Sequence, residues 1–465
     1  NGAIRKLTGD RRAEVTFHFE GNNAIGNWRR PPLPDSGEWS HLYGSPDNSG
    51  YGGESLQGAR TSDDLEVQWI GRPGPRYQAD RTGRKPSPLA AGGRLYMQGL
   101  NRIIAVDSFN GTILWSLEIP HFQRFNMPRD CSNWCADEKT LYVAVRDRCW
   151  RIDGATGVVE DFIEIPATGE DHDWGYLARH GDLLIGSAVK RGSSHTEFWW
   201  GEGWYDAQNG PATHQVCSDH LFAYDVNTGE VEWHHEDSLI LNPTITIGDD
   251  NVYFIESMVP EAKAASTRRI ALETLGGDLR LNSLRTTNGK RRWQKKLDID
   301  AGKTVCYLAH GNGTLVIVTS ADMKYHTYAF DDGSGKARWQ QESGWLDNKG
   351  DHGTHMSRPG ILANSVVVRP VVFDLRSGKK LDVRMPSGGC GTYAASSEAF
   401  FFRSGTVTMW DPRTGSATTW NRLRPDCWVS TIPADGLLLS PEGGGGCSCG
   451  NWMETSLAFK PKKWR

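Results

Sequence analysis

A short phrase recurs along this chain: a run of alternating apolar and polar residues, an aspartate, a glycine turn and a second strand that usually ends in tryptophan. It reads AVDSFNGTILW at residues 105–115 and AYDVNTGEVEW at residues 223–233. The alternation has the period of a β-strand, and Asn-Gly, Thr-Gly or Ser-Gly supplies the positive φ of a tight turn. The seven copies have their turn glycines at Gly111, Gly157, Gly229, Gly289, Gly335, Gly378 and Gly415. The pattern predicts repeated antiparallel strand pairs and very little helix.

Most copies follow a second strand pair around a polar turn, as in LAHGNGTLVIVT at residues 308–319. Four short antiparallel strands per unit, repeated radially, describe the blade of a β-propeller. We therefore expect an all-β fold, an eight-bladed β-propeller of four-stranded antiparallel blades, with seven blades as the alternative. The tryptophan four residues after the glycine is expected to pack between neighbouring blades.

The last unit, residues 434–464, contains the inner strands but ends before a glycine turn. We expect residues 65–74 to supply its outermost strand by pairing with the strand near Ser456–Phe459, since a shared blade leaves no sheet edge open. The N- and C-terminal strands would thus close the propeller, which is expected to span residues 39–465. Residues 1–38 show no repeat and are expected to be a leading segment, with the remnant of a preceding domain as one interpretation.

The A-x-D-x-x-x-G-x-x-x-W repeats, over residues 65–465, resemble those of the PQQ-like, or quinoprotein alcohol dehydrogenase-like, β-propellers. The segments GEWSHLYGSPDNSGYGG, NRIIAVDSFNGTILW and GGGGCSCGNWMETSLAF make the chain similar to the planctomycete-type members, which are mostly of unassigned function. The resemblance implies a superfamily of quinone-dependent dehydrogenases, outer-membrane assembly scaffolds and carbohydrate-active propellers. Such a fold leaves the function open.

The charge of the chain argues against a nucleic-acid partner, and its apolar pattern argues against a membrane-spanning helix. The formal net charge is −4 with no basic run, which argues against nucleic acid. No stretch approaches 18 consecutive apolar residues, so no membrane-spanning helix is predicted. The first residue is Asn, which fits a processed or trimmed chain, so a missing leader cannot be used to argue for the cytoplasm.

Nine cysteines are many for a reducing compartment, and with the resemblance they favour a periplasmic or secreted protein. The odd number leaves at least one cysteine outside intrachain pairs. Cys306, Cys390 and Cys427 occur at comparable positions of their units. Disulfides between adjacent blades are the favoured interpretation, ahead of free buried thiols and of a thiolate–histidine metal site.

The residues just before each inner strand are expected at the central funnel, where propellers gather their functional loops. His172, His355 and Tyr393 are the candidate catalytic residues, because imidazole and phenol groups transfer protons. Arg129 and Arg358 would clamp a carboxylate. The other candidate substrate-binding residues are Asn133, Trp134, Trp174, Trp199, Trp200, Trp204, His352, Arg424 and Trp428. The structural alternative is that these residues form turns and hydrogen bonds between blades.

These residue types favour binding and cleavage of an acidic or sulfated polysaccharide, by lyase-type proton abstraction. Trp199, Trp200 and Trp204 lie in a long insertion, residues 190–220, that could cap a sugar or pack on itself. The two alternatives are a quinone (PQQ)-dependent dehydrogenase and a non-catalytic binding or assembly scaffold with a protein partner.

The dehydrogenase alternative can be tested against features that the resemblance implies. Such enzymes hold their quinone over a tryptophan floor, beneath a disulfide of adjacent cysteines and beside a calcium ion bound by carboxylate and amide groups. This chain has no adjacent cysteines. Asp130, Asn133, Asp173 and Asn242 offer carboxylate and amide oxygens, so calcium and PQQ stay as candidate cofactors while none is certain.

Overall fold

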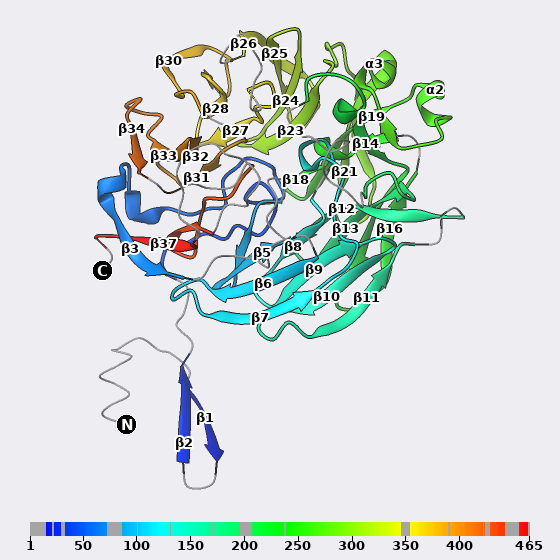
Figure 1. The fold of residues 1–465 in the computed structure, drawn as a ribbon. Helices are drawn as coiled ribbons and strands as arrows, with labels where there is room; N and C mark the ends of the chain where they lie inside the picture. The colour runs from blue at the N-terminus through cyan, green and yellow to red at the C-terminus, as the bar shows by residue number, and fades with distance from the viewer. Residues whose placement is uncertain are drawn as a thin grey trace.

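The fold was taken from a computed structural model. It describes residues 15–20, 23–28, 33–71, 86–99, 101–130, 132–166, 168–169, 171–195, 207–236, 239–345, 354–388, 391–421, 423, 428–441 and 455–463. Within these ranges, seven antiparallel sheets have four strands and one sheet is larger. Figure 1 shows the sheets set around a common centre. The fold is all-β, as predicted, and its four-stranded antiparallel sheets are consistent with a propeller.

The sheets follow one another along the chain and are named A to H in that order. Sheet A contains β4 (Leu89–Ala91), β5 (Arg94–Gln98), β6 (Arg102–Asp107) and β7 (Ile113–Glu118). Sheet B contains β8 (Trp134–Ala136), β9 (Thr140–Val145), β10 (Arg148–Asp153) and β11 (Val159–Glu164). Sheet C contains β12 (His172–His180), β13 (Leu183–Lys190), β15 (His220–Asp225) and β16 (Val231–His235).

Sheet D is the enlarged one, because the segment after β13 adds strands to it. It contains β14 (Gln215–Ser218), β17 (Leu239–Leu241), β18 (Thr246–Gly248), β19 (Asn251–Ser257), β20 (Arg269–Ile270), β21 (Leu279–Arg285) and β22 (Arg291–Lys296). Sheet E contains β23 (Val305–Gly311), β24 (Thr314–Ala321), β25 (Lys324–Asp331) and β26 (Ala337–Gly344).

The last three sheets complete the series. Sheet F contains β27 (Gly360–Leu362), β28 (Ser365–Val368), β29 (Val371–Asp374) and β30 (Lys380–Arg384). Sheet G contains β31 (Ala394–Ala395), β32 (Phe400–Ser404), β33 (Thr406–Trp410) and β34 (Ala417–Trp420). Sheet H contains β35 (Ile432–Ala434), β36 (Leu437–Ser440), β37 (Leu457–Pro461) and β3 (Leu65–Ile70). A separate hairpin joins β1 (Val15–Glu20) to β2 (Asn23–Trp28).

Helices are short and connect strands. They are η1 (Leu56–Gly58), η2 (Ser62–Asp64), η4 (Met127–Arg129), η5 (Pro211–Thr213), η6 (Asn242–Thr244), α2 (Pro260–Lys263), α3 (Leu272–Leu275) and η7 (Gly276–Asp278). Within the described ranges, no helix has the length and apolar character needed to cross a membrane.

The repeated aspartate and glycine build the turn between the two outer strands of a sheet. In sheet A, Asp107 Oδ1 accepts hydrogen bonds from the Phe109 and Asn110 backbone N–H groups (2.8 and 3.1 Å). Gly111 has a φ of 71°, a conformation that costs glycine least. All seven turn glycines have φ between 65° and 75°, which confirms the turn predicted from the repeat.

The repeated tryptophan packs on the turn glycine of the next sheet. A Cβ added to Gly157 of sheet B would lie 2.7 Å from the Trp115 ring of sheet A. The Trp115 Nε1–H also donates to the Gly154 carbonyl at 2.9 Å. The same packing joins Trp233 to Gly289, Trp293 to Gly335 and Trp339 to Gly378. This contact explains why glycine and tryptophan recur together: in sheets A, C, D and E the copy ends in a tryptophan whose ring packs on the turn glycine of the next sheet. Sheets B and F, whose copies end at Asp161 and Asp382, have no tryptophan at this position.

The N-terminal strand completes the last sheet, as predicted. β3 pairs antiparallel with β37, with Leu65 opposite Pro461 and Ile70 opposite Leu457. From β3, the Trp69 Nε1–H donates to the Ser108 carbonyl of the sheet A turn at 2.7 Å. Sheet H therefore meets sheet A through the same type of contact that joins the other neighbours.

Residues 37–54, here called the clasp, run past the ends of the innermost strands of all eight sheets. Its backbone carbonyls accept N–H bonds from Ala136, Ile247, His310, Ile361, Ala395 and Asp435, at 2.7 to 3.0 Å. Trp39 exchanges two backbone bonds with Ala90 of sheet A, and His41 Nε2 accepts from the Arg179 N–H of sheet C at 3.0 Å. Along the clasp, sheet H is contacted first, through Gly37, and sheets A to G follow in chain order, so one short segment connects all of them.

Candidate functional site

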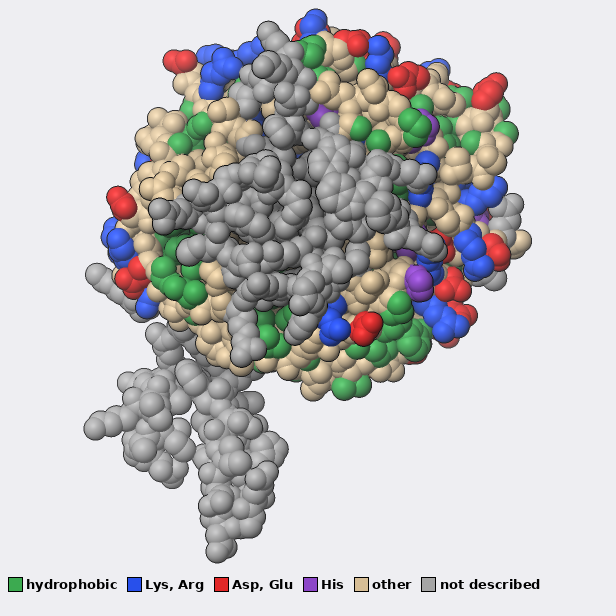
Figure 2. Space-filling model, viewed as in Figure 1, with side chains coloured by type: hydrophobic (Ala, Val, Ile, Leu, Met, Phe, Trp, Pro, Cys, Tyr) green, Lys and Arg blue, Asp and Glu red, His purple; other side chains and the backbone are tan. Residues whose placement is uncertain are grey.

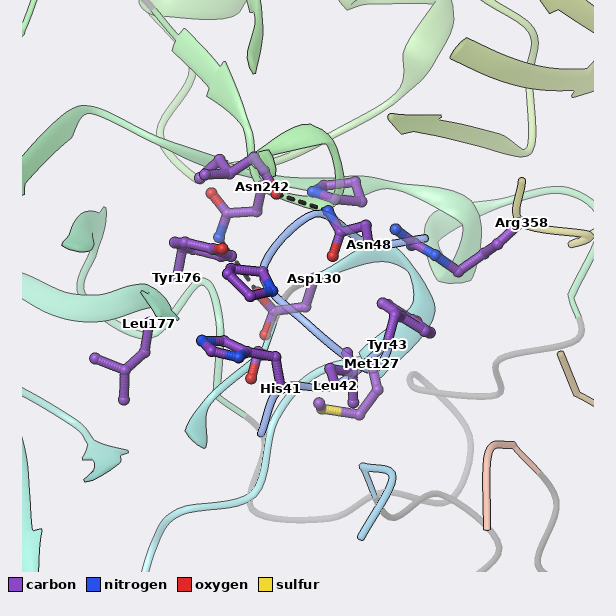
Figure 3. Close-up of a pocket in the computed structure, with 14 residues that line it drawn as sticks. His41, Leu42, Tyr43, Asn48, Met127, Asp130, Tyr176, Leu177, Asn242 and Arg358 are labelled. Atoms are coloured by element: carbon purple, nitrogen blue, oxygen red, sulfur yellow. Dashed lines mark hydrogen bonds between the residues drawn. The ribbon is translucent and has the colours of Figure 1, made fainter. Parts of the chain in front are cut away.

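A small cavity lies between the clasp, sheets B to D and Arg358 (Figure 3). His41, Asn48, Asp130, Asn242 and Arg358 are among its lining residues. Only about 20 Å³ is open to the centres of water molecules. That is room for one or two ordered waters, far less than a sugar or a fused-ring cofactor needs. A larger open hollow, of about 560 Å³, borders the clasp at Ser45, Asp47 and Tyr51.

Asp130 is held by a buried ion pair and by an amide. Arg124 donates to both of its carboxylate oxygens, at 2.7 and 3.1 Å, and both side chains are buried. The Asn242 Nδ2–H group points toward the same carboxylate at 3.3 Å (Figure 3). Burial raises the pKa of Asp130, and the guanidinium of Arg124 opposes that rise. This carboxylate is committed to internal partners.

Arg358 stacks between two aromatic rings at the edge of the cavity. Its guanidinium carbon lies 3.8 Å from the Tyr43 ring centroid and 4.2 Å from that of Tyr307. Tyr43 belongs to the clasp, and its hydroxyl accepts from the Trp428 indole N–H at 2.9 Å. Cation–π stacking on two faces fixes the guanidinium where the sequence predicted a group that clamps a substrate.

Arg129 is fully buried and bonds to backbone carbonyls. Its Nε–H donates to Thr304 at 2.8 Å, and its two terminal nitrogens donate to Ala212 at 3.2 Å and Ala207 at 2.7 Å. The guanidinium therefore fixes the segment before β14 to the one before β23, which is the inter-blade role that the sequence analysis kept as its alternative.

The candidate proton-transfer groups lie in separate surroundings. The Tyr393 hydroxyl donates to the Val367 carbonyl at 2.7 Å, and burial raises its pKa to about 12. His355 is buried, with Nε2 3.2 Å from the Ala207 carbonyl oxygen and its ring beside Trp345. His172 begins β12, with Nδ1 2.7 Å from the Thr168 hydroxyl.

The remaining candidates divide into packed residues and residues outside the described ranges. Trp134 and Trp174 are fully buried core residues, and the Asn133 amide donates to the Phe122 carbonyl at 3.3 Å. Trp199, Trp200, Trp204, His352 and Arg424 lie outside the described residues. The structure brings three pairs of candidates together. Arg358 and Trp428 are joined through Tyr43, Arg129 and His355 meet at the Ala207 carbonyl, and the Tyr393 hydroxyl bonds to the Arg358 carbonyl.

The four described cysteines, Cys135, Cys149, Cys217 and Cys306, are free and buried. Burial raises the pKa of each thiol above its usual range. The expected disulfide is thus not found at Cys306, while Cys390 and Cys427 lie outside the described residues.

The described residues do not fit a bound quinone or calcium ion. The central cavity is of water size. Asp130 is engaged by Arg124, and Asp173 accepts the Gly192 backbone N–H at 2.7 Å and lies 3.5 Å from His195. Carboxylates with such partners are poorly placed as calcium ligands, which need several convergent oxygens. No chemical step is derived through either group.

The clasp is the functional element that the sequence analysis did not predict. It supplies His41, Tyr43 and Asn48 to the cavity, and Asn48 donates through Nδ2 to the Ile245 carbonyl at 2.8 Å. The segment GEWSHLYGSPDNSGYGG was recognised as distinctive. Its lack of strand or helix periodicity gave no sign that its backbone would bond to every sheet.

Comparison with known proteins identifies the fold. The profile of the family described as outer membrane protein assembly factor BamB matches residues 213–342, which include β15 and β16 of sheet C, sheet D and most of sheet E. No curated protein sequence matches the chain.

Solved structures with the same fold share little sequence with this chain. The quinohemoprotein alcohol dehydrogenase from Comamonas testosteroni is 12% identical, with a TM-score of 0.56 over 91% of this chain and 80% of that one. A europium-containing methanol dehydrogenase is 12% identical, with a TM-score of 0.52 over 88% and 90%. The computationally designed protein Ika8 is also 12% identical, with a TM-score of 0.51 over 84% and 99%. At this identity the likeness shows the fold and no shared activity.

These findings correct the predicted function. The prediction of a polysaccharide lyase is wrong, because the matching profile is that of an assembly factor and the natural structures just named are dehydrogenases. In the described structure, Arg129 donates to backbone carbonyls and the Tyr393 hydroxyl donates to the Val367 carbonyl. Residues 213–342 are thus similar to the assembly-factor family, and the chain shares its fold with the dehydrogenase structures just named.

Proposed function

We propose that this chain is a non-catalytic propeller that binds another protein, as an assembly scaffold does. The observation that carries the proposal is that the described candidate site residues are bound to internal partners. The polar side chains that the sequence places at the funnel bond to backbone carbonyls, to each other or to aromatic rings, and the small cavity holds only one or two waters. The match to the assembly-factor profile supports the same interpretation.

The outer rim supplies a surface suited to a protein partner. Val67 and Ile70 on β3, Ile113 and Leu114 on β7, and Phe162 on β11 are exposed large hydrophobic side chains. These three strands are the outermost strands of sheets H, A and B. Figure 2 shows hydrophobic side chains along the lower edge of the face, where Figure 1 labels β7 and β11. An edge strand with exposed apolar residues is a template for pairing with an extended peptide.

The proposal is tested first against the dehydrogenase alternative. Purified full-length chain is incubated with PQQ and calcium, passed through a desalting column and assayed with an artificial electron acceptor and a panel of alcohols. We expect no retained quinone absorbance and no dye reduction. Stoichiometric retention of the quinone, or turnover of any alcohol, would overturn the scaffold proposal in favour of the dehydrogenase.

A second experiment tests the rim. A photo-crosslinking amino acid is placed at Leu114 on β7 or, as a matched control, at Leu381 on β30, which is similarly exposed on the outermost strand of sheet F. In cells of the native host, we expect one defined protein adduct from position 114 and none from position 381. Equal adducts from both positions would mean non-specific contact and would contradict a rim binding site.

We also propose that the eight sheets form eight blades of one closed propeller over residues 39–465, with residues 1–38 as a leading segment. The support is that the clasp contacts sheet H first and then sheets A to G in chain order, and that Trp69 of sheet H packs on the Gly111 turn of sheet A. An experimental structure with seven blades, or with a gap between sheets H and A, would contradict this arrangement.

A periplasmic or secreted location remains part of the proposal, because nine cysteines are many for a reducing compartment. Thiols are counted under denaturing, non-reducing conditions on protein taken from its native host. With Cys135, Cys149, Cys217 and Cys306 free, we expect fewer than nine reactive thiols. Nine reactive thiols would contradict an oxidising location.

A further inference from the structure

Two histidines and a glutamate gather on the outer strands of sheet C, away from the centre. His220 begins β15, His234 lies in β16, and Glu236 follows directly after β16. One ligand atom from each of the three residues lies within 4.8 Å of the other two. The two strands are paired, with Leu221 opposite His235, so the sheet backbone holds the group together.

The ligand atoms of this group lie near one another but are not yet aimed at one point. His220 Nδ1 lies 3.8 Å from Glu236 Oε2, and the His220 and His234 rings stack, with centroids 4.9 Å apart and planes 27° apart. Two ligand atoms that are each about 2.1 Å from a tetrahedral zinc ion lie about 3.4 Å from each other. The His234 and Glu236 side chains are exposed, so both have room to turn their ligand atoms toward an ion beside His220 Nδ1.

His220 Nδ1, which lies nearest to Glu236, has no hydrogen-bond partner among the described residues. This nitrogen is also buried. An unpaired buried nitrogen is costly, and a metal ion would satisfy it.

A second histidine–carboxylate group is a weaker candidate. In the described residues, Asp249, His310 and Asp332 also lie close enough to hold an ion. There, the single imidazole presents Nε2 to both carboxylates and is already 3.0 Å from Asp332. His310 Nε2 already has Asp332 as its hydrogen-bond partner, so this group has no unpaired nitrogen that a metal ion would satisfy.

We propose that His220, His234 and Glu236 bind one zinc ion, with water in the fourth position. Two imidazole nitrogens and one carboxylate are a zinc ligand set, and three protein ligands leave one tetrahedral position open. Because two of the ligands are exposed, the open position faces solvent. The ion would link β15 to β16 and present a coordination site on the surface of sheet C. This site is independent of the proposed scaffold function.

Sheet E provides a matched control. His326 of β25 lies opposite Glu342 of β26, with Nδ1 and Oε2 3.9 Å apart. This cross-strand pair has nearly the same separation as His220 and Glu236. Sheet E groups no second histidine with it among the described residues, so it tests whether a single histidine–glutamate pair is sufficient.

Zinc binding is measured by calorimetry and by metal analysis after dialysis, on the full chain with any affinity tag removed. We expect one equivalent of zinc in the unmodified protein. His234→Ala and Glu236→Gln should each weaken binding about tenfold or more, because each removes a ligand, while His326→Ala leaves binding unchanged. Cobalt(II) in place of zinc should give the visible absorption of a four-coordinate site, and His234→Ala should remove it.

Three outcomes would overturn the zinc site. The first is the absence of stoichiometric zinc binding. The second is retention of full affinity in both His234→Ala and Glu236→Gln, and the third is an equal loss in His326→Ala. Both ligand substitutions lie at exposed positions, so circular dichroism and an unchanged urea midpoint without metal serve to show that the variants fold.

Discussion

At the scale of single residues, the polar groups around the centre are explained by burial. A buried charge or donor must find a partner, and the nearest partners in a propeller are the backbone carbonyls between sheets. Arg129 meets three such carbonyls, and Arg124 meets two in addition to Asp130. Sequence alone could not separate these roles from catalysis, because histidine, arginine and tyrosine serve equally well in both.

Breaking the central ion pair should be strongly destabilising. Asp130→Asn keeps the shape of the side chain but leaves the buried Arg124 charge without its carboxylate. We expect a loss of about 3 kcal/mol in the free energy of unfolding, seen as a lower urea midpoint. The double variant Arg124→Met/Asp130→Leu removes both charges and should lose clearly less than this. A single variant as stable as the unmodified protein would show that the pair contributes little.

His41 should make the protein sensitive to acid. Burial, with a smaller effect of nearby His180, lowers its pKa from 6.5 to about 3. The folded state therefore binds fewer protons than the unfolded state between these values, and stability present above pH 6.5 is lost as the pH falls toward 3. For one proton, the free energy of unfolding changes by about 1.4 kcal/mol per pH unit. His41→Gln, whose side chain does not titrate, should reduce this dependence on pH.

We test this pH dependence by measuring the urea midpoints of the unmodified protein and of His41→Gln from pH 7.5 to pH 4. The two curves should converge as the pH falls, because only the unmodified protein loses the contribution of a neutral buried imidazole. Parallel curves across the whole range would mean that His41 is protonated at the same pH in both states.

At the scale of the element, the repeat shows what a sequence can predict. The turn glycines and the pairing of β3 with β37 follow from local signals, namely alternation and Asn-Gly or Thr-Gly turns. The docking of tryptophan on the next turn also follows, because it repeats with the same spacing. Strands β14 and β20 of sheet D could not be predicted, because neither belongs to a repeat: β14 lies in the insertion after β13, and β20 lies in the connection between β19 and β21.

The glycines of two turns should differ in their tolerance of alanine. Gly229 and Gly335 both have positive φ, 75° and 67°. A Cβ at Gly335 would lie 2.7 Å from the Trp293 ring, whereas one at Gly229 meets nothing within 4 Å. Gly229→Ala should lower the free energy of unfolding by about 1 kcal/mol, through backbone strain alone. Gly335→Ala should lower it by about 2 kcal/mol more, because the Trp293 ring must move.

Thermal or urea unfolding of the two variants, side by side, measures this difference. The comparison also tests the link between tryptophan and glycine in neighbouring copies of the repeat. The copy before Gly229 ends at Asp161 and has no tryptophan, while the copy before Gly335 ends at Trp293. Equal costs at the two glycines would mean that the tryptophan does not need the space that glycine leaves.

At the scale of the whole molecule, the sheets are linked by a segment that carries no repeat. The clasp receives backbone hydrogen bonds from sheets that are far apart in the chain, such as those of Ala136 and Ala395. Glu54 fixes its end, since Oε2 accepts from Gly37 and Gly436 (3.1 and 2.7 Å) and Oε1 accepts from Leu56 (2.7 Å). Sequence patterns report local structure, so a segment whose partners are all distant is hard to predict.

This arrangement predicts that the inner strand ends open together. Hydrogen exchange at the amides of Ala136, Ile247, His310 and Ala395, measured by mass spectrometry, should proceed with one common opening free energy, because releasing the clasp exposes all of them. Glu54→Leu leaves the three N–H groups that bond to Glu54 without an acceptor and should speed exchange at all four sites by a similar factor. Glu54→Gln, which keeps the acceptor oxygen, should have a smaller effect. Two results would contradict this prediction: exchange rates that differ from sheet to sheet, or acceleration by Glu54→Leu only near sheet H. Either result would mean that each sheet binds the clasp independently.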